Sequence, residues 1–195
     1  MKFTILSLFP DMFVPLKTSI LKRANIEVIN FREYSKDKHK KVDDTVYGGG
    51  AGMLLSCQPI YDCLQNIDKE HKAYRIFMTP FAPVLSQIKA KELSKKEEII
   101  ILCGHYEGVD QRVIDMCFDE CISIGNFVLT GGELPAMVLV DCVSRFTGII
   151  KDESLNDDGH PQYTKPDNFM GVKVPDVLLS GNHANIKKFN VETKK

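Results

Sequence analysis

The chain has 195 residues, with 25 Lys and Arg against 26 Asp and Glu, and its formal net charge at pH 7 is -1. The length allows one full domain with a remainder, or two small domains, and excludes a third. The near-zero charge excludes binding of nucleic acid through bulk positive charge, so any polyanion must be met by a local patch. The apolar runs are too short to cross a bilayer, so we expect no membrane partner.

Short apolar runs predict buried strands, and segments with helical spacing separate them. The runs are rich in Ile, Val and Phe and cover residues 3–8, 26–31, 75–79, 99–103 and 121–124. The expected helices cover residues 11–24, 59–66, 84–93, 110–117 and 134–146. Strand and helix alternate along the chain, so we predict an α/β fold with a mostly parallel sheet flanked by helices.

Three loops that follow expected strands are the candidate ligand-binding loops, at residues 78–80, 103–108 and 125–133. Ligands collect beyond the carboxyl ends of strands in open parallel sheets, because the loops there expose backbone N–H groups. Two of these loops contain glycine turns, one from Gly104 to Gly108 and one at Gly131 and Gly132. Two adjoining glycine turns favour a small-ligand pocket more than either turn does alone.

A dense glycine cluster spans residues 48–52 and holds Gly48, Gly49, Gly50 and Gly52. Such a stretch lets the backbone approach a ligand or a partner closely, and a flexible hairpin loop explains it equally well. A phosphate-binding P-loop is disfavoured because no Lys-Ser or Lys-Thr pair follows. The basic run at residues 36–41 precedes the cluster and is either a solvated face or an edge that faces a polyanion.

The six cysteines form no C-x-x-C pair, and the five histidines lack the spacing of metal ligands. We therefore predict reduced thiols in a cytoplasmic protein and no structural zinc site.

The composition changes after residue 146. Residues 147–168 are rich in Asp, Asn, Gly, His and Pro, which predicts a flexible linker between residues 1–146 and the remainder at residues 169–195. The acidic residues at 152–158 either keep the linker soluble or supply a general base on a loop that closes over a pocket.

Motifs along most of the chain resemble one family, the bacterial tRNA (guanine-N1)-methyltransferases that modify guanine 37, next to the anticodon. The matching segments are residues 6–13, 42–44, 47–53, 103–110, 123–125, 129–136, 144–146, 163–166 and 177–183. The chain departs from the family pattern at Val46 and Ala51, where proline is usual, and at Asn126, where aspartate is usual.

The resemblance implies a SPOUT fold with a C-terminal trefoil knot, a homodimer, tRNA rather than DNA as the partner, and S-adenosylmethionine as the methyl donor. Magnesium is associated with activity in this family, and no carboxylate cluster in the sequence identifies a site for it. The implied donor-binding residues are Met78, Thr79, Pro80, Gly104, His105, Tyr106, Glu107, Gly108, Ser123, Ile124, Gly125, Phe127, Leu129, Gly131, Gly132 and Pro135.

The chemistry of the implied reaction needs a base and a cation. Guanine N1 carries a proton that must leave as the methyl group arrives, and a cation stabilises the charge that builds on O6. By resemblance the base matches Asp158, with Asp157 as the alternative, and the cation matches Arg145; each site would combine two subunits. The residues implied to hold the tRNA are Asp43, Asp44, Tyr47, Gly48, Gly49, Lys38 and Lys40.

Family members continue into a small helical domain that grips tRNA, so residues 169–195 are expected to be the start of a domain that is otherwise absent from this chain. Two alternatives remain open. One is a non-catalytic SPOUT-like protein that binds RNA and cofactor, and the other is an unrelated nucleotide-binding domain that uses the glycine loops differently.

Overall fold

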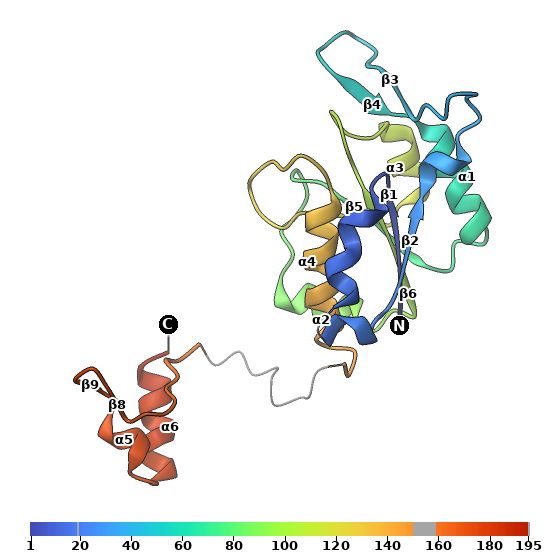
Figure 1. The fold of residues 1–195 in the computed structure, drawn as a ribbon. Helices are drawn as coiled ribbons and strands as arrows, with labels where there is room; N and C mark the ends of the chain where they lie inside the picture. The colour runs from blue at the N-terminus through green and yellow to red at the C-terminus, as the bar shows by residue number, and fades with distance from the viewer. Residues whose placement is uncertain (19, 150–158, 195) are drawn as a thin grey trace. The chain divides into compact units, whose positions relative to one another are not determined.

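The computed structural model describes residues 1–18, 20–149 and 159–194 (Figure 1). The chain divides into two compact units, Met1–Lys151 and Asp152–Lys195, and each is described by itself. In the described part of the chain, no helix combines the length and the apolar character that a membrane crossing requires.

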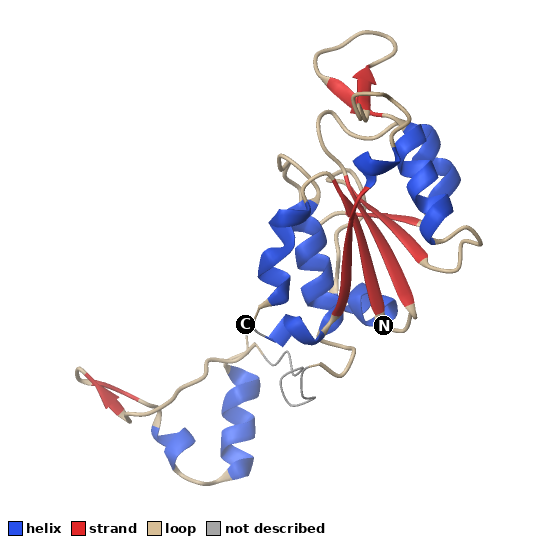
Figure 2. Ribbon diagram, turned by 45° about the vertical axis from the view of Figure 1, so that its right-hand side comes forward, coloured by secondary structure: helices blue, strands red, loops and turns tan. Residues whose placement is uncertain are grey.

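A five-stranded sheet forms the centre of the first unit, in the order β2-β1-β6-β5-β7, and all its neighbouring strands are parallel (Figure 2). Its strands are β1 (Lys2–Ser7), β2 (Asn25–Asn30), β5 (Tyr74–Met78), β6 (Glu98–Cys103) and β7 (Glu120–Ile122). Each strand coincides with one of the apolar runs, so the predicted α/β fold with a parallel sheet is confirmed.

Both faces of the sheet are buried, which explains why its strands read as continuous apolar runs. Ile99, Ile101 and Cys103 of β6 belong to one core cluster, whereas Ile100 and Leu102 belong to the other. Successive side chains of a strand point to opposite faces, so one short run supplies both cores.

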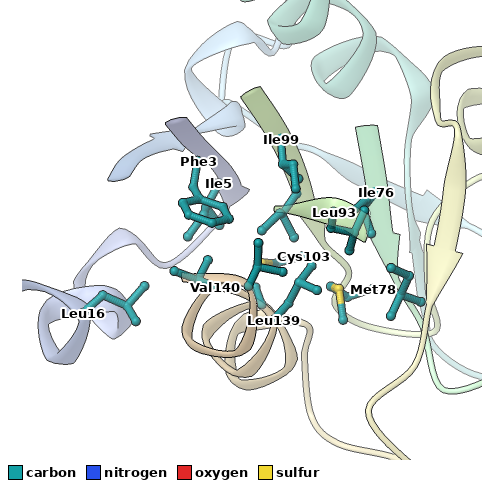
Figure 3. Close-up of a cluster of buried hydrophobic side chains, with 14 of the residues drawn as sticks. Phe3, Ile5, Leu16, Ile76, Met78, Leu93, Ile99, Cys103, Leu139 and Val140 are labelled. Carbon is teal, nitrogen blue, oxygen red and sulfur yellow. The ribbon is translucent and has the colours of Figure 1, made fainter. Parts of the chain in front are cut away.

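Helices cover the two faces of the sheet. The first face packs against α4 (Glu133–Ser144), α2 (Gln87–Leu93) and the 3₁₀ helix η1 (Pro10–Lys17). Figure 3 shows Leu139 and Val140 of α4 beside Phe3 and Cys103 of the sheet. The second face packs against α1 (Cys57–Ile67), α3 (Gln111–Cys117) and the 3₁₀ helix η3 (Phe31–Tyr34).

Two expected helices differ from the prediction. The segment predicted as one helix over residues 11–24 forms two 3₁₀ helices, η1 and η2 (Ile20–Arg23). Pro15 lies inside η1 and lacks the N–H that a regular α-helix would use there. The helix predicted from residue 84 begins only at Gln87, because Val84 forms a parallel bridge with Ser123 and the Ser86 hydroxyl caps α2.

The glycine cluster lies in the loop of a β-hairpin. Strands β3 (Asp43–Thr45) and β4 (Met53–Leu55) pair antiparallel, and the loop between them projects from the rest of the first unit (Figure 1). Gly48, Gly49, Gly50 and Gly52 all have positive φ, a region that other residues rarely adopt. The structure therefore has the hairpin that was one of the two explanations for this cluster.

In the second unit, β8 (Asn168–Phe169) and β9 (Val172–Lys173) form a short hairpin, followed by α5 (Asp176–Leu179) and α6 (His183–Glu192). The Asn182 side chain accepts a hydrogen bond from the Asn185 N–H and so caps α6. The described residues at 147–149 and 159–167 lie outside helices and strands, and residues 150–158 of the expected linker lie outside the described part.

A buried ion pair joins α1 to the sheet at the edge where β5 begins. Arg75 is only 2% exposed, and its Nε and a terminal nitrogen lie 3.0 and 2.9 Å from the Asp68 carboxylate. We expect Asp68→Ala to lower the free energy of unfolding by about 3 kcal/mol, because it leaves a buried guanidinium without its carboxylate. Urea unfolding measures this loss. Glu70→Ala removes an exposed ion pair with Lys72 from the same turn and is expected to cost less than about 1 kcal/mol; equal losses would contradict the prediction.

Candidate functional site

A cleft of about 350 Å³ lies where β5, β6 and β7 reach their carboxyl ends. Parallel neighbours end at the same edge of a sheet, so the three loops that follow these strands meet there. The lining residues are Phe77, Met78, Thr79, Pro80, Phe81, Gly104, His105, Tyr106, Glu107, Gly108, Val109, Gln111, Ile122, Ser123, Ile124, Gly125, Phe127, Val128, Leu129, Thr130, Gly131, Gly132 and Pro135. All the residues that the resemblance assigns to donor binding are among these lining residues. That they bind the donor stays a prediction.

Gly132 brings the start of α4 against the end of β6. Its N–H donates a hydrogen bond of 2.9 Å to the carbonyl oxygen of Gly104. A Cβ on Gly132 would lie 2.7 Å from Cys103 Cα and 2.8 Å from the Gly104 nitrogen, both of which are backbone atoms. Glycine at this position therefore fixes how closely two walls of the cleft approach.

The turn after β7 forms a third wall of the cleft and is hydrogen-bonded to the loop that follows β5. The Ser123 N–H donates to the Pro83 carbonyl at 3.0 Å, and the Leu85 N–H donates to the Ser123 carbonyl at 2.8 Å. The Ser123 hydroxyl also bonds to the backbone of Gly125 at 2.9 and 3.1 Å. Backbone hydrogen bonds thus hold the glycine-containing turn after β7 in place.

Glu133 and Ser7 are two polar residues beside the cleft to which the sequence analysis assigned no role. Glu133 is 1% exposed, and one carboxylate oxygen accepts a hydrogen bond of 2.7 Å from the Ser7 hydroxyl at the end of β1. Its other oxygen lies 3.0 Å from Nε2 of His105, which lines the cleft. The sequence analysis places Glu133 at the end of the candidate loop at residues 125–133, and no local pattern connects it with Ser7.

Burial raises the pKa of the Cys103 thiol well above its ordinary value, with a further contribution from the charge of Glu133. Cys103 is 1% exposed at the end of β6, so it is a neutral packing residue and not a nucleophile.

In the described part of the chain, no group of three or more His, Cys, Asp or Glu side chains is arranged to hold a metal ion.

The β3-β4 hairpin joins the cleft through β4. The Glu107 N–H donates to the Met53 carbonyl at 3.0 Å, and the Leu55 N–H donates to the Gly108 carbonyl at 3.0 Å. Asp43, Asp44, Tyr47, Gly48 and Gly49, the residues expected to hold the tRNA, therefore lie on a hairpin that is bonded to a wall of the cleft. Tyr47 is 95% exposed in the hairpin loop.

The remaining expected substrate residues, Lys38 and Lys40, precede β3. Lys38 is exposed. The Lys40 ammonium donates a hydrogen bond of 2.8 Å to the Glu33 carbonyl and lies 3.7 Å from the Glu33 carboxylate. The basic run is thus exposed at a bend between η3 and β3, on the chain segment that leads into the hairpin.

Arg145 does not reach the cleft of its own chain. It caps the C-terminal end of α4, whereas Glu133 at the other end of this 12-residue helix lies at the cleft. At 1.5 Å per residue, the two ends are about 18 Å apart. Asp157 and Asp158 lie outside the described residues, so the structure places neither of them.

A second hollow, of about 460 Å³, lies within the second unit. Its lining includes Tyr163, Lys165 and Asp167. His160 and Asn190 also line it, and among the described atoms His160 Nδ1 and Asn190 Oδ1 are buried without a hydrogen-bond partner. Most of this hollow's lining is apolar, and these two atoms can bond to water or a ligand.

Comparison with known proteins identifies relatives of the whole chain. The family model described as tRNA (Guanine-1)-methyltransferase TrmD matches residues 1–195. A tRNA (guanine-N(1)-)-methyltransferase of Finegoldia magna is 51% identical over 210 aligned residues, which cover 100% of this chain and 90% of the relative. The relative of the same name from Ruminiclostridium cellulolyticum is 51% identical over 98% of this chain and 90% of its own length. The Clostridioides difficile relative is 46% identical, with coverages of 98% and 91%.

Proposed function

The chain belongs to the tRNA (guanine-1)-methyltransferase family, and it is an enzyme that methylates N1 of guanine in tRNA; from this premise we propose that the target is guanine 37 and that S-adenosylmethionine is the donor. The observation that carries the proposal is the cleft at the carboxyl edge of the sheet, because its lining holds every residue that the motifs assign to the donor. Its volume of about 350 Å³ falls within the usual range for small-ligand sites.

The residues of the cleft suit a nucleoside with a charged group. Phe77, Phe127 and Leu129 supply apolar surface for a purine, while glycines at two walls leave backbone N–H and C=O groups accessible. A Cβ at Gly131 or Gly132 would collide with neighbouring atoms of the site, so the chain keeps these walls free of side chains. When bound, the donor supplies a methyl group on a positively charged sulfur, which is an electrophile.

Asp158 and Arg145 are the proposed catalytic pair. Asp158 takes the proton from guanine N1 while the nitrogen forms its bond to the methyl carbon, and the bond from that carbon to sulfur breaks. Arg145 stabilises the negative charge that develops towards O6. We assign no residue to magnesium, because no described cluster of acidic, His or Cys side chains could hold it.

A homodimer accounts for the position of Arg145. Arg145 is separated from the cleft of its own chain by the length of α4, so we propose that it serves the cleft of a second copy. The outer face of α4 supports this arrangement, because Leu134 and Val138 are 51% and 46% exposed and lie one turn apart. Large apolar side chains in a row on a helix are typical of a surface that a partner covers.

We also propose that the chain forms the trefoil knot of the SPOUT fold. Ser123 bonds to Pro83 and Leu85 in the loop after β5, while Gly132 bonds to Gly104 in the loop after β6. Residues 123–132 are therefore bonded near their two ends to the loops after β5 and β6, which supports a threaded path. The second unit is the proposed tRNA-binding part of the chain, supported by exposed Lys187 and Lys188 on α6.

Methylation of tRNA transcripts tests the proposed function. Incubation with labelled S-adenosylmethionine is expected to label a transcript with guanine at position 37, and reverse transcription is expected to stop at that nucleotide. A transcript with adenine at position 37 is the control and should remain unlabelled. Bound donor without methyl transfer would support the non-catalytic alternative, and preferential binding of ATP would support an unrelated nucleotide-binding protein.

The basic run provides a separate prediction about the tRNA. We expect Lys38→Ala with Lys40→Ala to raise the KM for tRNA and to reduce the dependence of log K on log salt by about 2, since each lysine that meets a phosphate releases about one counterion. Filter binding at several salt concentrations measures both quantities. Lys69→Ala with Lys72→Ala removes the same charge from the turn before β5 and should leave the salt slope unchanged. Equal slopes for the two double variants would refute the assignment.

A further inference from the structure

Glu133 is a charged group in a place where charge is costly. Its carboxylate is 1% exposed at the first residue of α4, beside the apolar end of β6. Removal of a carboxylate from water is unfavourable unless hydrogen bonds and an opposite charge compensate it. The site supplies both, because the Ser7 hydroxyl donates to one oxygen at 2.7 Å and His105 Nε2 lies 3.0 Å from the other. The N-terminus of α4 also favours a negative charge there.

His105 connects the Glu133 carboxylate with the cleft. It lies in the cleft lining, directly after Gly104, and its ring packs against Phe9 with the ring centroids 4.7 Å apart. The next residue, Tyr106, has a φ of +58°, in the left-handed region that non-glycine residues rarely adopt. A loop with such a backbone needs surrounding contacts to hold it. Through its contact with His105, Glu133 therefore stabilises the turn at residues 104–108, which contains this positive φ.

We propose that Glu133 is a positioning residue for methyl-donor binding, which acts through His105 on the turn at residues 104–108 and is itself anchored by Ser7. This inference rests on the proposed function, because it assumes that the cleft binds S-adenosylmethionine. It adds two residues, Glu133 and Ser7, that touch neither the donor nor the guanine and yet determine the shape of the cleft.

Several groups pack around the His105 ring. The groups around it are Glu133 from α4, the Phe9 ring and its loop neighbours. Among the loop neighbours, the Glu107 side chain is turned towards Gly52 of the hairpin. The protonated imidazole pairs with the Glu133 carboxylate more strongly than the neutral form does.

Donor binding by the full chain tests the proposal. We expect Glu133→Gln to raise both the Kd from calorimetry and the KM for S-adenosylmethionine by about 10- to 100-fold, the usual effect of losing a hydrogen bond between charged groups. The KM for tRNA should stay within about twofold, as expected when the lost contact does not touch that substrate.

A matched pair of hydroxyl variants separates positioning from general destabilisation. Both variants remove a hydrogen bond from a β1 hydroxyl to a carboxylate. Ser7→Ala removes the bond to Glu133 beside the cleft, and Thr4→Val removes the 2.8 Å bond to Glu98, away from the cleft. Only Ser7→Ala should weaken donor binding, although both should lower the thermal midpoint. Unchanged donor binding in Glu133→Gln, or equal weakening in Thr4→Val, overturns the proposal. Wild-type protein that neither binds S-adenosylmethionine nor methylates tRNA would instead overturn the proposed function.

Discussion

Asp158→Asn is expected to lower kcat for methyl transfer by about 10²- to 10⁴-fold, the usual contribution of a positioned general base. The amide keeps the size of the side chain and cannot accept the N1 proton. Donor and tRNA are still held by other residues, so the Kd for S-adenosylmethionine and the affinity for tRNA should change little. Single-turnover methylation with saturating enzyme measures the chemical step directly, and calorimetry measures donor binding.

The matched control for this variant is Asp157→Asn, which removes the same charge from the neighbouring position. Asp157→Asn should retain nearly full kcat. Should the two variants exchange their effects, the base is Asp157. If both variants keep wild-type rates, then no carboxylate at this position removes the proton and the proposed mechanism fails.

Gly132→Ala is expected to lower kcat/KM for S-adenosylmethionine by about 100-fold, because a shift of about 1 Å in a binding wall has an effect of this size. The added Cβ would lie 2.7 Å from Cys103 Cα and 2.8 Å from the Gly104 nitrogen. Backbone atoms of a buried strand cannot move aside as a side chain does, so α4 and the end of β6 must separate. The hydrogen bond of 2.9 Å between Gly132 and Gly104 would lengthen or break.

Gly104→Ala is the control for the effect of adding a methyl group to this part of the cleft. Its Cβ would meet the Phe77 ring at 3.1 Å, and the ring can turn by a few tenths of an ångström. We therefore expect a loss of less than about tenfold, within the range of mild overpacking. Methylation kinetics at varied donor concentration, together with thermal unfolding, compare the two variants. A smaller loss for Gly132→Ala than for Gly104→Ala would contradict the role of backbone contact.

Much of the first unit was predictable because its pattern is local. Five apolar runs became the five parallel strands, since a strand buried on both faces needs a continuous apolar sequence. The cleft followed from the same pattern, because the loops after parallel strands meet at one edge. The family motifs then assigned residues to the cleft, and all the assigned donor residues line it.

Other features of the chain depend on contacts that no local pattern contains. The segment at residues 11–24 has helical spacing, but packing on the sheet and Pro15 favour 3₁₀ geometry. The separation of Arg145 from the cleft becomes visible only when α4 is placed with Glu133 at the cleft and Arg145 at the far end.

The α/β class, the strands, the ligand-binding loops and the family could be predicted from the sequence, because each depends on residue types at short spacing. The backbone contacts across the cleft and the buried polar pairs depend instead on residues that are far apart in the sequence. Ser7 and Glu133 lie 126 residues apart and form a buried hydrogen bond of 2.7 Å. That contact exists because β1 and β6 end, and α4 begins, at one edge of the sheet. Buried polar groups there require hydrogen-bond partners.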